Sequence, residues 1–311
     1  MLALPKISLH GAGAIGDMVN LVASKQWGKA LVVTDGQLVK LGLLDSLFNA
    51  LDAHQMSYHL FDEVFPNPTE ALVQKGYAAY QDAECDYLIA FGGGSPIDTA
   101  KAIKILTANP GPSTDYSGVG KVKNAGVPLV AINTTAGTAA EMTSNAVIID
   151  AARQVKEVII DPNIIPDIAV DDASVMLDIP ASVTAATGMD ALTHAIEAYV
   201  SVGAHPLTDA NALEAIRLIN LWLPKAVDDG HNLEAREQMA CATRSIWRAW
   251  RLTAPVWGWC MLWRTSRARR TTCRTACATP SCCRSSKTLT ARTRSPDSPV
   301  WRRRWALTRA A

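Results

Sequence analysis

The sequence has no histidine after His231, although it continues to residue 311. Imidazole is the commonest metal ligand in proteins. Residues 232–311 therefore lack this ligand for any metal site. Beyond residue 240 there is one glycine, Gly258, and one acidic residue, Asp297. This tail also lacks the regular alternation of apolar and polar positions that marks a packed element. The tail therefore does not have the sequence pattern of a folded domain.

Long apolar runs are missing as well. No uninterrupted apolar stretch has the length of a membrane span, and no basic segment followed by a long apolar one begins at Met1. These absences argue against a membrane anchor and an export signal. We expect a soluble cytoplasmic protein with no membrane partner and with reduced thiols. With 311 residues, the chain is long enough for two domains.

Charge is distributed unevenly along the chain. Residues 1–240 carry 14 Lys and Arg against 28 Asp and Glu, whereas residues 241–311 carry 16 against 1. A basic arm can neutralise nucleic-acid phosphates, but such arms are usually polar. This tail instead holds seven of the nine tryptophans and six of the seven cysteines, and the cysteine spacing fits no paired zinc pattern. We expect no nucleic-acid partner.

The first half has the rhythm of an α/β domain. Short apolar runs alternate with helical patterns, which predicts a largely parallel sheet with ligands gathered beyond the carboxyl ends of its strands. The predicted strands are residues 30–35, 87–95, 128–135 and 168–172, and the first two are followed by predicted helices at 38–51 and 98–106.

A triple glycine follows the second apolar strand. Gly92, Gly93, Gly94 and Ser95 lead into a helix that carries Asp98 near its start. Glycines let backbone amides approach a pyrophosphate, and a helix N-terminus favours negative charge, so the segment predicts a phosphate-binding loop. It matches neither GxGxxG nor a Walker loop, because no GK[ST] is present, and a tight turn is the alternative.

Other polar residues fall at the same predicted edge. Asp35 ends the first strand, where a carboxylate can bind ribose hydroxyls and repel an added phosphate, which favours NAD over NADP; a helix cap is the equal alternative. Thr134, Thr135 and Thr138 follow another strand, and Asn67 lies in the rigid turn PNPT. Such threonines are more often turn and cap residues than ligands.

Asp190 and His194 are four residues apart in a segment with helical periodicity and no proline between Ala181 and Ser201. Residues at this spacing project from one helix face, so the pair could bind a divalent cation. By spacing alone, a surface interaction between the two side chains is the commoner explanation.

Three motifs resemble those of a known family. GGGSPIDTAKA, NTTAGTAAEMT and TAATGMDALTHAIEAY, in this order, resemble the iron-containing, group III alcohol dehydrogenases, including lactaldehyde reductases and propanediol dehydrogenases. The resemblance covers residues 1 to about 240. It implies an N-terminal dinucleotide-binding α/β domain with a parallel sheet, an all-α metal-binding domain, and a cleft with NAD and a metal. The metal is usually Fe²⁺, with Zn²⁺ as the alternative.

The resemblance also assigns roles. It implies that Asp190 and His194 are the first two metal ligands. The residues implied to contact NAD are Asp35 and Asn67 on the ribose side, Gly92, Gly93, Gly94, Ser95 and Asp98 in the pyrophosphate loop, Thr134, Thr135 and Thr138 in a second loop, and Lys156. In this scheme the metal polarises the oxygen of a small alcohol or aldehyde while hydride moves to or from nicotinamide. A metal-dependent cyclase or glycerol dehydrogenase shares the general architecture, but TGMDALTHAIEAY favours the alcohol dehydrogenase branch.

The family pattern stops near residue 240, where a histidine-rich stretch should supply two further metal ligands. A reading frame moved back by one base explains the change: with permissible codons, Ser245 to Arg251 decodes as QYLAGMA, and Val256 to Cys277 as LGLVHAMAHQPGATHNLPHGVC. The second string contains the missing histidines, at Cys260–Met261 and Arg274–Thr275. A frameshift near Cys241 is therefore our interpretation.

We thus expect three segments: an NAD-binding α/β domain at 1–180, the start of a truncated helical domain at 181–240, and an aberrant basic tail at 241–311. Two ligands hold a divalent ion poorly, and apolar residues such as Leu213, Ile216 and Leu223 should lack part of their packing. We expect impaired oxidation of a small alcohol, with non-catalytic NAD binding or a damaged product as the alternative. A homo-oligomer is compatible with the sequence, but neither its state nor the alcohol can be determined from it.

Overall fold

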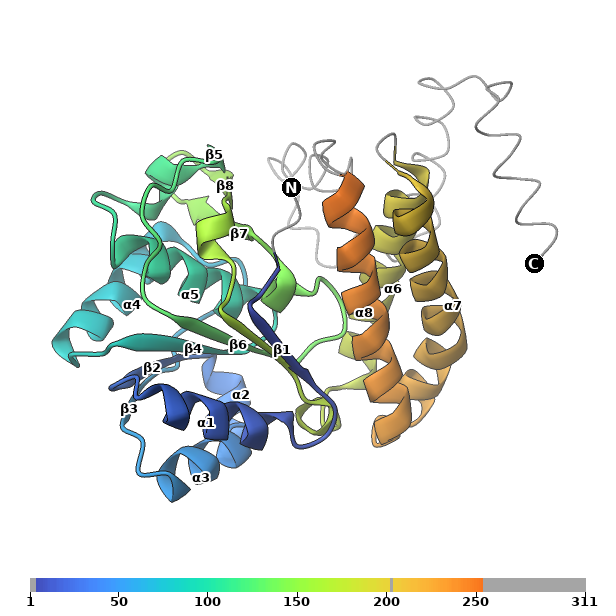
Figure 1. Cartoon of the computed structure of the whole chain (residues 1–311), viewed down its shortest axis with the longest axis horizontal. Coiled ribbons are helices and arrows are strands. Elements are labelled where there is room, and N and C mark those ends of the chain that lie inside the picture. Colours follow the sequence, from blue (N-terminus) through green and yellow to red (C-terminus); the bar gives the residue numbers. More distant parts are fainter. Residues whose placement is uncertain (1–3, 202–203, 254–311) are drawn as a thin grey trace. The chain divides into compact units, whose positions relative to one another are not determined.

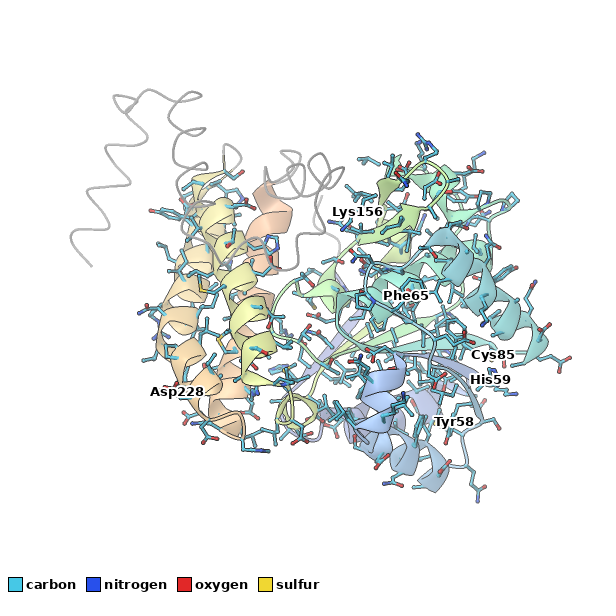
Figure 2. The ribbon with its side chains drawn as sticks, turned by 180° about the vertical axis from the view of Figure 1, so that it is seen from behind. Tyr58, His59, Phe65, Cys85, Lys156 and Asp228 are labelled. Carbon is cyan, nitrogen blue, oxygen red and sulfur yellow. The ribbon has the colours of Figure 1, made fainter. Side chains whose placement is uncertain are left out.

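The computed structural model describes residues 4–201 and 204–253 (Figure 1). Its centre is a six-stranded parallel sheet in the order β1-β9-β6-β4-β2-β3, which confirms the predicted parallel α/β architecture. The strands are β1 (Ile7–His10), β2 (Ala30–Val33), β3 (Tyr58–Phe61), β4 (Tyr87–Gly92), β6 (Leu129–Asn133) and β9 (Ile168–Asp171). The edge strand β3 carries Tyr58 and His59 (Figure 2).

Helices cover both faces of this sheet (Figure 1). On one face lie α1 (Ala14–Lys25), α2 (Gly36–Lys40) and α3 (Asp45–Ala53), and on the other α4 (Glu70–Asp82) and α5 (Gly94–Leu106). Along β4, Tyr87, Ile89 and Phe91 join the first core and Leu88 and Ala90 the second. Successive side chains of a strand point to opposite faces, so a strand buried on both sides is apolar throughout.

A smaller sheet lies after α5. Its strands are β5 (Gly118–Val119), β7 (Asn145–Asp150) and β8 (Val155–Ile160), in the order β5-β8-β7. β7 and β8 pair as an antiparallel hairpin, which the sequence analysis did not predict. Single-turn helices fill the connections: η1 (Ser113–Tyr116), η2 (Ala140–Met142), η3 (Pro162–Ile164) and η4 (Ala173–Met176).

Two helix boundaries differ from the sequence prediction. The helix expected over residues 38–51 is divided into α2 and α3, because Gly42 adopts φ 70°, a left-handed conformation that ends a helix. Helix α5 begins at Gly94, four residues before the predicted start, so the triple glycine itself forms the helix N-terminus.

Three long helices follow: α6 (Ala181–Val200), α7 (Pro206–Asp228) and α8 (Leu233–Thr253). They share an apolar core, and small side chains such as Ala191 and Ala195 on α6 allow close packing. Leu213 is exposed as expected, whereas Ile216 and Leu223 pack against this core. The expected boundary at residue 240 falls inside α8; the tail from residue 254 lies outside the described residues. Within 4–201 and 204–253, no helix has the length and hydropathy needed to span a membrane.

Candidate functional site

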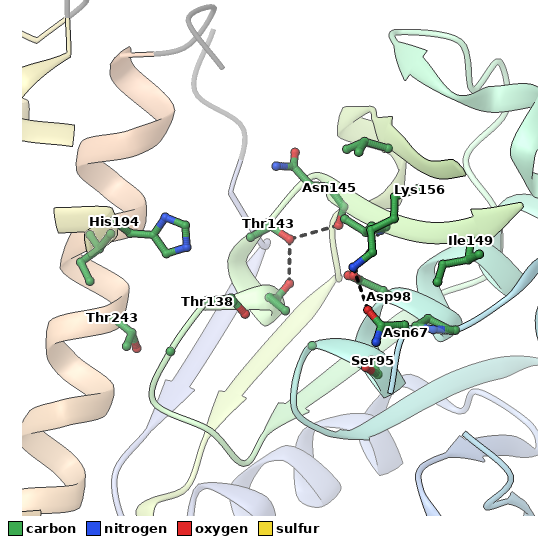
Figure 3. Close-up of a pocket in the computed structure, with 17 residues that line it drawn as sticks. Asn67, Ser95, Asp98, Thr138, Thr143, Asn145, Ile149, Lys156, His194 and Thr243 are labelled. Atoms are coloured by element: carbon green, nitrogen blue, oxygen red, sulfur yellow. Dashed lines mark hydrogen bonds between the residues drawn. The ribbon is translucent and has the colours of Figure 1, made fainter. Parts of the chain in front are cut away.

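A pocket lies at the carboxyl ends of the central strands, between the α/β elements and helices α6 and α8 (Figure 3). Its wall contains residues of the small sheet, of α5 and of the loops that follow strands of the large sheet. The lining residues are Asn67, Pro68, Gly94, Ser95, Asp98, Gly137, Thr138, Ala140, Thr143, Asn145, Val147, Ile149, Lys156, Val158, His194, Thr243 and Ile246. Seven of the thirteen predicted site residues are among them, so residues predicted from separate motifs meet in one place.

The triple glycine joins β4 to α5 at the floor of this pocket. Gly92 has φ 143°, and a Cβ added there would lie 2.7 Å from Cγ of Pro96, so only glycine fits. Gly93 is the N-cap of α5 and provides no side-chain cap to the first-turn amides. Gly94 and Ser95 line the pocket. A 13-residue helix thus presents an uncapped, partly positive N-terminus to the pocket.

Asp98 follows one turn later, and its Oδ2 accepts a hydrogen bond of 3.1 Å from the Val147 amide on β7. Burial raises the pKa of Asp98 to about 6, while Lys101 and the Val147 amide oppose this shift. Asp98 therefore connects α5 to β7 and lines the pocket as well.

The predicted threonine loop lies against the glycine loop. The buried Thr134 donates its amide to Gly92 O (3.1 Å). Thr135 Oγ1 is 3.1 Å from the position of a Cβ at Gly93, so these two segments touch. Of the three threonines, only Thr138 is among the pocket residues; it is exposed and points into the open space in Figure 3.

Asn67 and Lys156 form a pair at the other side of the pocket (Figure 3). Lys156 Nζ on β8 donates a 2.8 Å hydrogen bond to Asn67 Oδ1, although the two are 89 positions apart. Asp35 is not among the pocket residues, and its Oδ1 caps α2 by accepting the amides of Gln37 (2.9 Å) and Leu38 (3.0 Å). The helix-cap alternative for Asp35 is therefore present in the structure.

Asp190 and His194 lie one turn apart on α6, with Asp190 Oδ2 3.5 Å from His194 Nε2. Both are largely buried, with side-chain exposures of 20% and 13%, and His194 lines the pocket. Glu197, which the sequence analysis did not select, lies 3.9 Å from His194 Nδ1 through its Oε2. Its i+3 spacing from His194 was the available signal. Among the described residues no cluster of three or more His, Cys, Asp or Glu side chains could hold a metal ion.

The sequence analysis also missed a group of charged side chains behind the pocket: Lys101, Glu141, Asp171 and Arg244. Burial, and then the Asp171 charge, raise the pKa of Glu141 well above its ordinary value. Burial likewise raises the pKa of Asp171 to about 6, against the opposing charge of Arg244 and a hydrogen bond from Asn133. Single residues on apolar strands and helices gave no sequence signal that they would meet in the interior.

Comparison with known proteins places this geometry in a family. Residues 5–173 match the family "Iron-containing alcohol dehydrogenase", and residues 184–245 match "Fe-containing alcohol dehydrogenase family, C-terminal". Both matches end at or before residue 245, close to where the family motifs stop in the sequence.

Two relatives and one solved structure illustrate the similarity. The chain is 46% identical over 239 residues to the NAD-dependent methanol dehydrogenase of Bacillus methanolicus and 43% identical over 241 residues to lactaldehyde reductase of Escherichia coli K12, covering 77% of this chain and 63% of each relative. The structure of a 1,3-propanediol oxidoreductase superposes with a TM-score of 0.78 and 40% identity, over 81% of this chain and 66% of the other. The chain thus spans 57 to 63% of the length of the curated relatives it matches.

Proposed function

Because this chain belongs to the iron-containing alcohol dehydrogenase family, we propose that its pocket binds NAD and that it retains, in weakened form, hydride exchange between NAD and a small alcohol or aldehyde. The observation that carries this proposal is the uncapped N-terminus of α5 facing the same pocket as His194. The first feature suits a pyrophosphate and the second a metal-bound substrate.

The cofactor residues are distributed along the pocket. The amides of Gly93, Gly94 and Ser95 would receive the pyrophosphate, with Gly92 allowing the sharp entry into α5. Lys156, held by Asn67, brings a positive charge to the same pocket. In this scheme Thr134 and Thr135 support the glycine loop, Thr138 faces the ligand, Asp98 fixes α5 to β7, and Asp35 binds ribose with the carboxylate oxygen that does not cap α2.

The metal pair fits two corners of a site. Two ligands at about 2.1 Å from a tetrahedral ion lie about 3.4 Å apart, close to the 3.5 Å between Asp190 Oδ2 and His194 Nε2. Glu197 near Nδ1 is placed to favour the tautomer in which Nε2 is the ligand atom. The remaining corners have no ligand among the described residues, and the sequence has no histidine after His231. Within residues 4–201 and 204–253 the site therefore has two ligands.

The chain's own residues can still do part of the reaction's work. They would bind and orient NAD in the pocket that His194 also lines, with Asp190 beside His194 on α6. When bound, NAD takes up or gives the hydride and the metal polarises the substrate oxygen. Since two ligands bind a divalent ion weakly, we expect little turnover. Methanol, lactaldehyde and propanediol in the names of the relatives suggest a small alcohol or aldehyde, and a homo-oligomer is part of the same proposal.

The second candidate function is NAD binding without turnover, which the same two-ligand site favours. Isothermal titration of the purified chain with NAD, with and without Fe²⁺, separates the candidates when combined with alcohol oxidation measured as NADH absorbance. Weak NADH formation that depends on Fe²⁺ supports the enzyme. Binding without any turnover supports the second candidate, an ordinary rate contradicts the weakened site, and absence of NAD binding contradicts both.

A further inference from the structure

We propose that Lys101 is a positioning residue for the nucleotide pocket: from inside α5 it holds the segment Ala140–Asn145 in place and balances the Asp98 charge, so that NAD can bind. This inference rests on the proposed NAD-binding function. Lys101 does not line the pocket, and it acts through residues that do.

Three hydrogen bonds of Lys101 go to one segment. Its side chain is fully buried, and its Nζ donates to Ala140 O (2.7 Å), to Thr143 Oγ1 and to Asn145 O (2.9 Å). An ammonium group has three protons, so these three acceptors match its capacity. Hydrogen bonds from a charged donor in the interior are stronger than neutral ones. One side chain therefore fastens residues 39 to 44 positions away in sequence.

The segment that Lys101 fastens forms a wall of the pocket. Ala140, Thr143 and Asn145 are all pocket residues, and Thr138 lies just before them. Ala139 has φ 48° and ψ 46°, the left-handed conformation that is strained for a residue with a Cβ. Such a conformation persists only where the surroundings hold it; the Met142 amide binds the Ala139 carbonyl, and Lys101 adds a restraint at the next carbonyl, Ala140 O.

Charge gives Lys101 a second effect. Burial raises the pKa of Asp98 to about 6, and the Lys101 ammonium is the largest influence in the opposite direction. The same ammonium opposes the raised pKa of Glu141. At a pH at which Asp98 is ionised, loss of this cation would leave its carboxylate without a compensating charge, close to the place where a negatively charged pyrophosphate would bind. A buried, unpaired charge of this sign disfavours an anionic ligand.

Lys104 provides a matched control on the same helix. It is also buried, with 4% exposure, and its Nζ is ion-paired with Asp167 Oδ2 at 3.0 Å. Asp167 directly precedes β9, at the end of the sheet opposite to the pocket. Loss of either lysine should destabilise the fold, because each leaves buried polar partners behind. Of the two lysines, Lys101 is the one that binds the pocket segment Ala140–Asn145.

The test compares Lys101→Met, Lys101→Arg and Lys104→Met in the full chain, with Kd for NAD, ADP-ribose and adenosine measured by titration well below the unfolding temperature of each variant. For Lys101→Met we expect Kd for NAD and ADP-ribose to rise about tenfold or more, and Kd for the uncharged adenosine to change less. Lys101→Arg should recover part of the loss, and Lys104→Met should change Kd less than about twofold. Hydrogen exchange should increase over residues 139–145 in Lys101→Met alone.

Several results would overturn the inference. An unchanged Kd for NAD in Lys101→Met, equal weakening by Lys104→Met, or an equal loss for adenosine and ADP-ribose would each contradict a positioning role for Lys101. If the unsubstituted chain binds no NAD, the proposed function fails and this inference with it. If the unsubstituted chain binds NAD normally and Lys101→Met does too, only the inference fails.

Discussion

The α/β elements and the three long helices differ in how many residues they contribute to the pocket. The α/β elements contribute pocket residues from the loop before α4, from α5, from the threonine loop, and from β7 and β8. Hydrogen bonds of Asp98, Lys101 and Lys156 connect these segments. The helices contribute His194 from α6 and Thr243 and Ile246 from α8. The proposed nucleotide site lies within the first region, whereas a four-coordinate metal site needs more ligands than the described residues of the second region provide. We therefore expect the two parts of the proposed site to be affected separately.

The sharpest way to separate the two regions is to remove the metal pair. The double variant Asp190→Ala/His194→Ala should lower the affinity for Co²⁺ or Fe²⁺ by about 100-fold, because no ligand pair remains on α6, while Kd for NAD stays within about twofold. Co²⁺ absorption spectroscopy and NAD titration measure the two effects. His205→Ala is the matched control. If NAD binding weakens in parallel with metal binding, the two regions are not independent.

A substitution in the glycine loop tests the α/β region. Gly92→Ala places a Cβ 2.7 Å from Pro96 Cγ at φ 143°, so we expect NAD binding to weaken about tenfold and the fold to lose about 1–2 kcal/mol. The control is Gly16→Ala on α1, where a Cβ meets nothing within 4 Å and helix propensity predicts a small gain in stability. Titration with NAD and urea unfolding report both quantities. Equal effects of the two substitutions would contradict a strained phosphate loop.

Buried carboxyl groups make the interior behind the pocket sensitive to pH. Asp171 has a folded pKa of about 6, above the ordinary value of 3.8. A carboxyl with a raised folded pKa contributes stability below its unfolded pKa, and this contribution is lost as the pH rises through the folded pKa. Between about pH 4 and pH 7 we expect the chain to lose about 1–3 kcal/mol more stability than Asp171→Asn.

Urea unfolding across this pH range measures that difference. Asp178→Asn, at an exposed position, is the control variant. A parallel pH dependence in Asp171→Asn and the unsubstituted chain would mean that Asp171 does not titrate as burial implies.

The smallest expected effect concerns the outer face of the helices. Leu213 on α7 is 42% exposed, so Leu213→Ser should change the free energy of unfolding by less than about 0.5 kcal/mol and reduce aggregation in light scattering. Leu218→Ala, on the same helix but 5% exposed, should instead cost about 2–4 kcal/mol. Unchanged aggregation in Leu213→Ser would argue that this face does not drive association.

The strand, the glycine turn and the shared helix face in the proposed site could be predicted from the sequence because their signals are local. The run from Tyr87 to Ser95 contains both the buried strand and the glycine turn, and Asp190 and His194 disclose their shared face through their spacing. Asp35 shows the limit of such reasoning, because its place at the end of a strand suited both a ribose ligand and a helix cap, and the structure shows the cap. The expected helix over 38–51 failed at Gly42, whose φ depends on the packed turn.

The sequence by itself determined the alternation of strands and helices, the glycine loop and the one-turn spacing of Asp190 and His194. It also determined the absence of any histidine after His231. Each of these features depends on neighbouring residues or on composition. Only the tertiary structure decided that Lys156 meets Asn67, that Lys101 fastens the Ala140–Asn145 segment, and that Glu141 and Asp171 share an interior with Arg244. These contacts join positions far apart in the chain, and their strength comes from burial, which removes water as a competing partner.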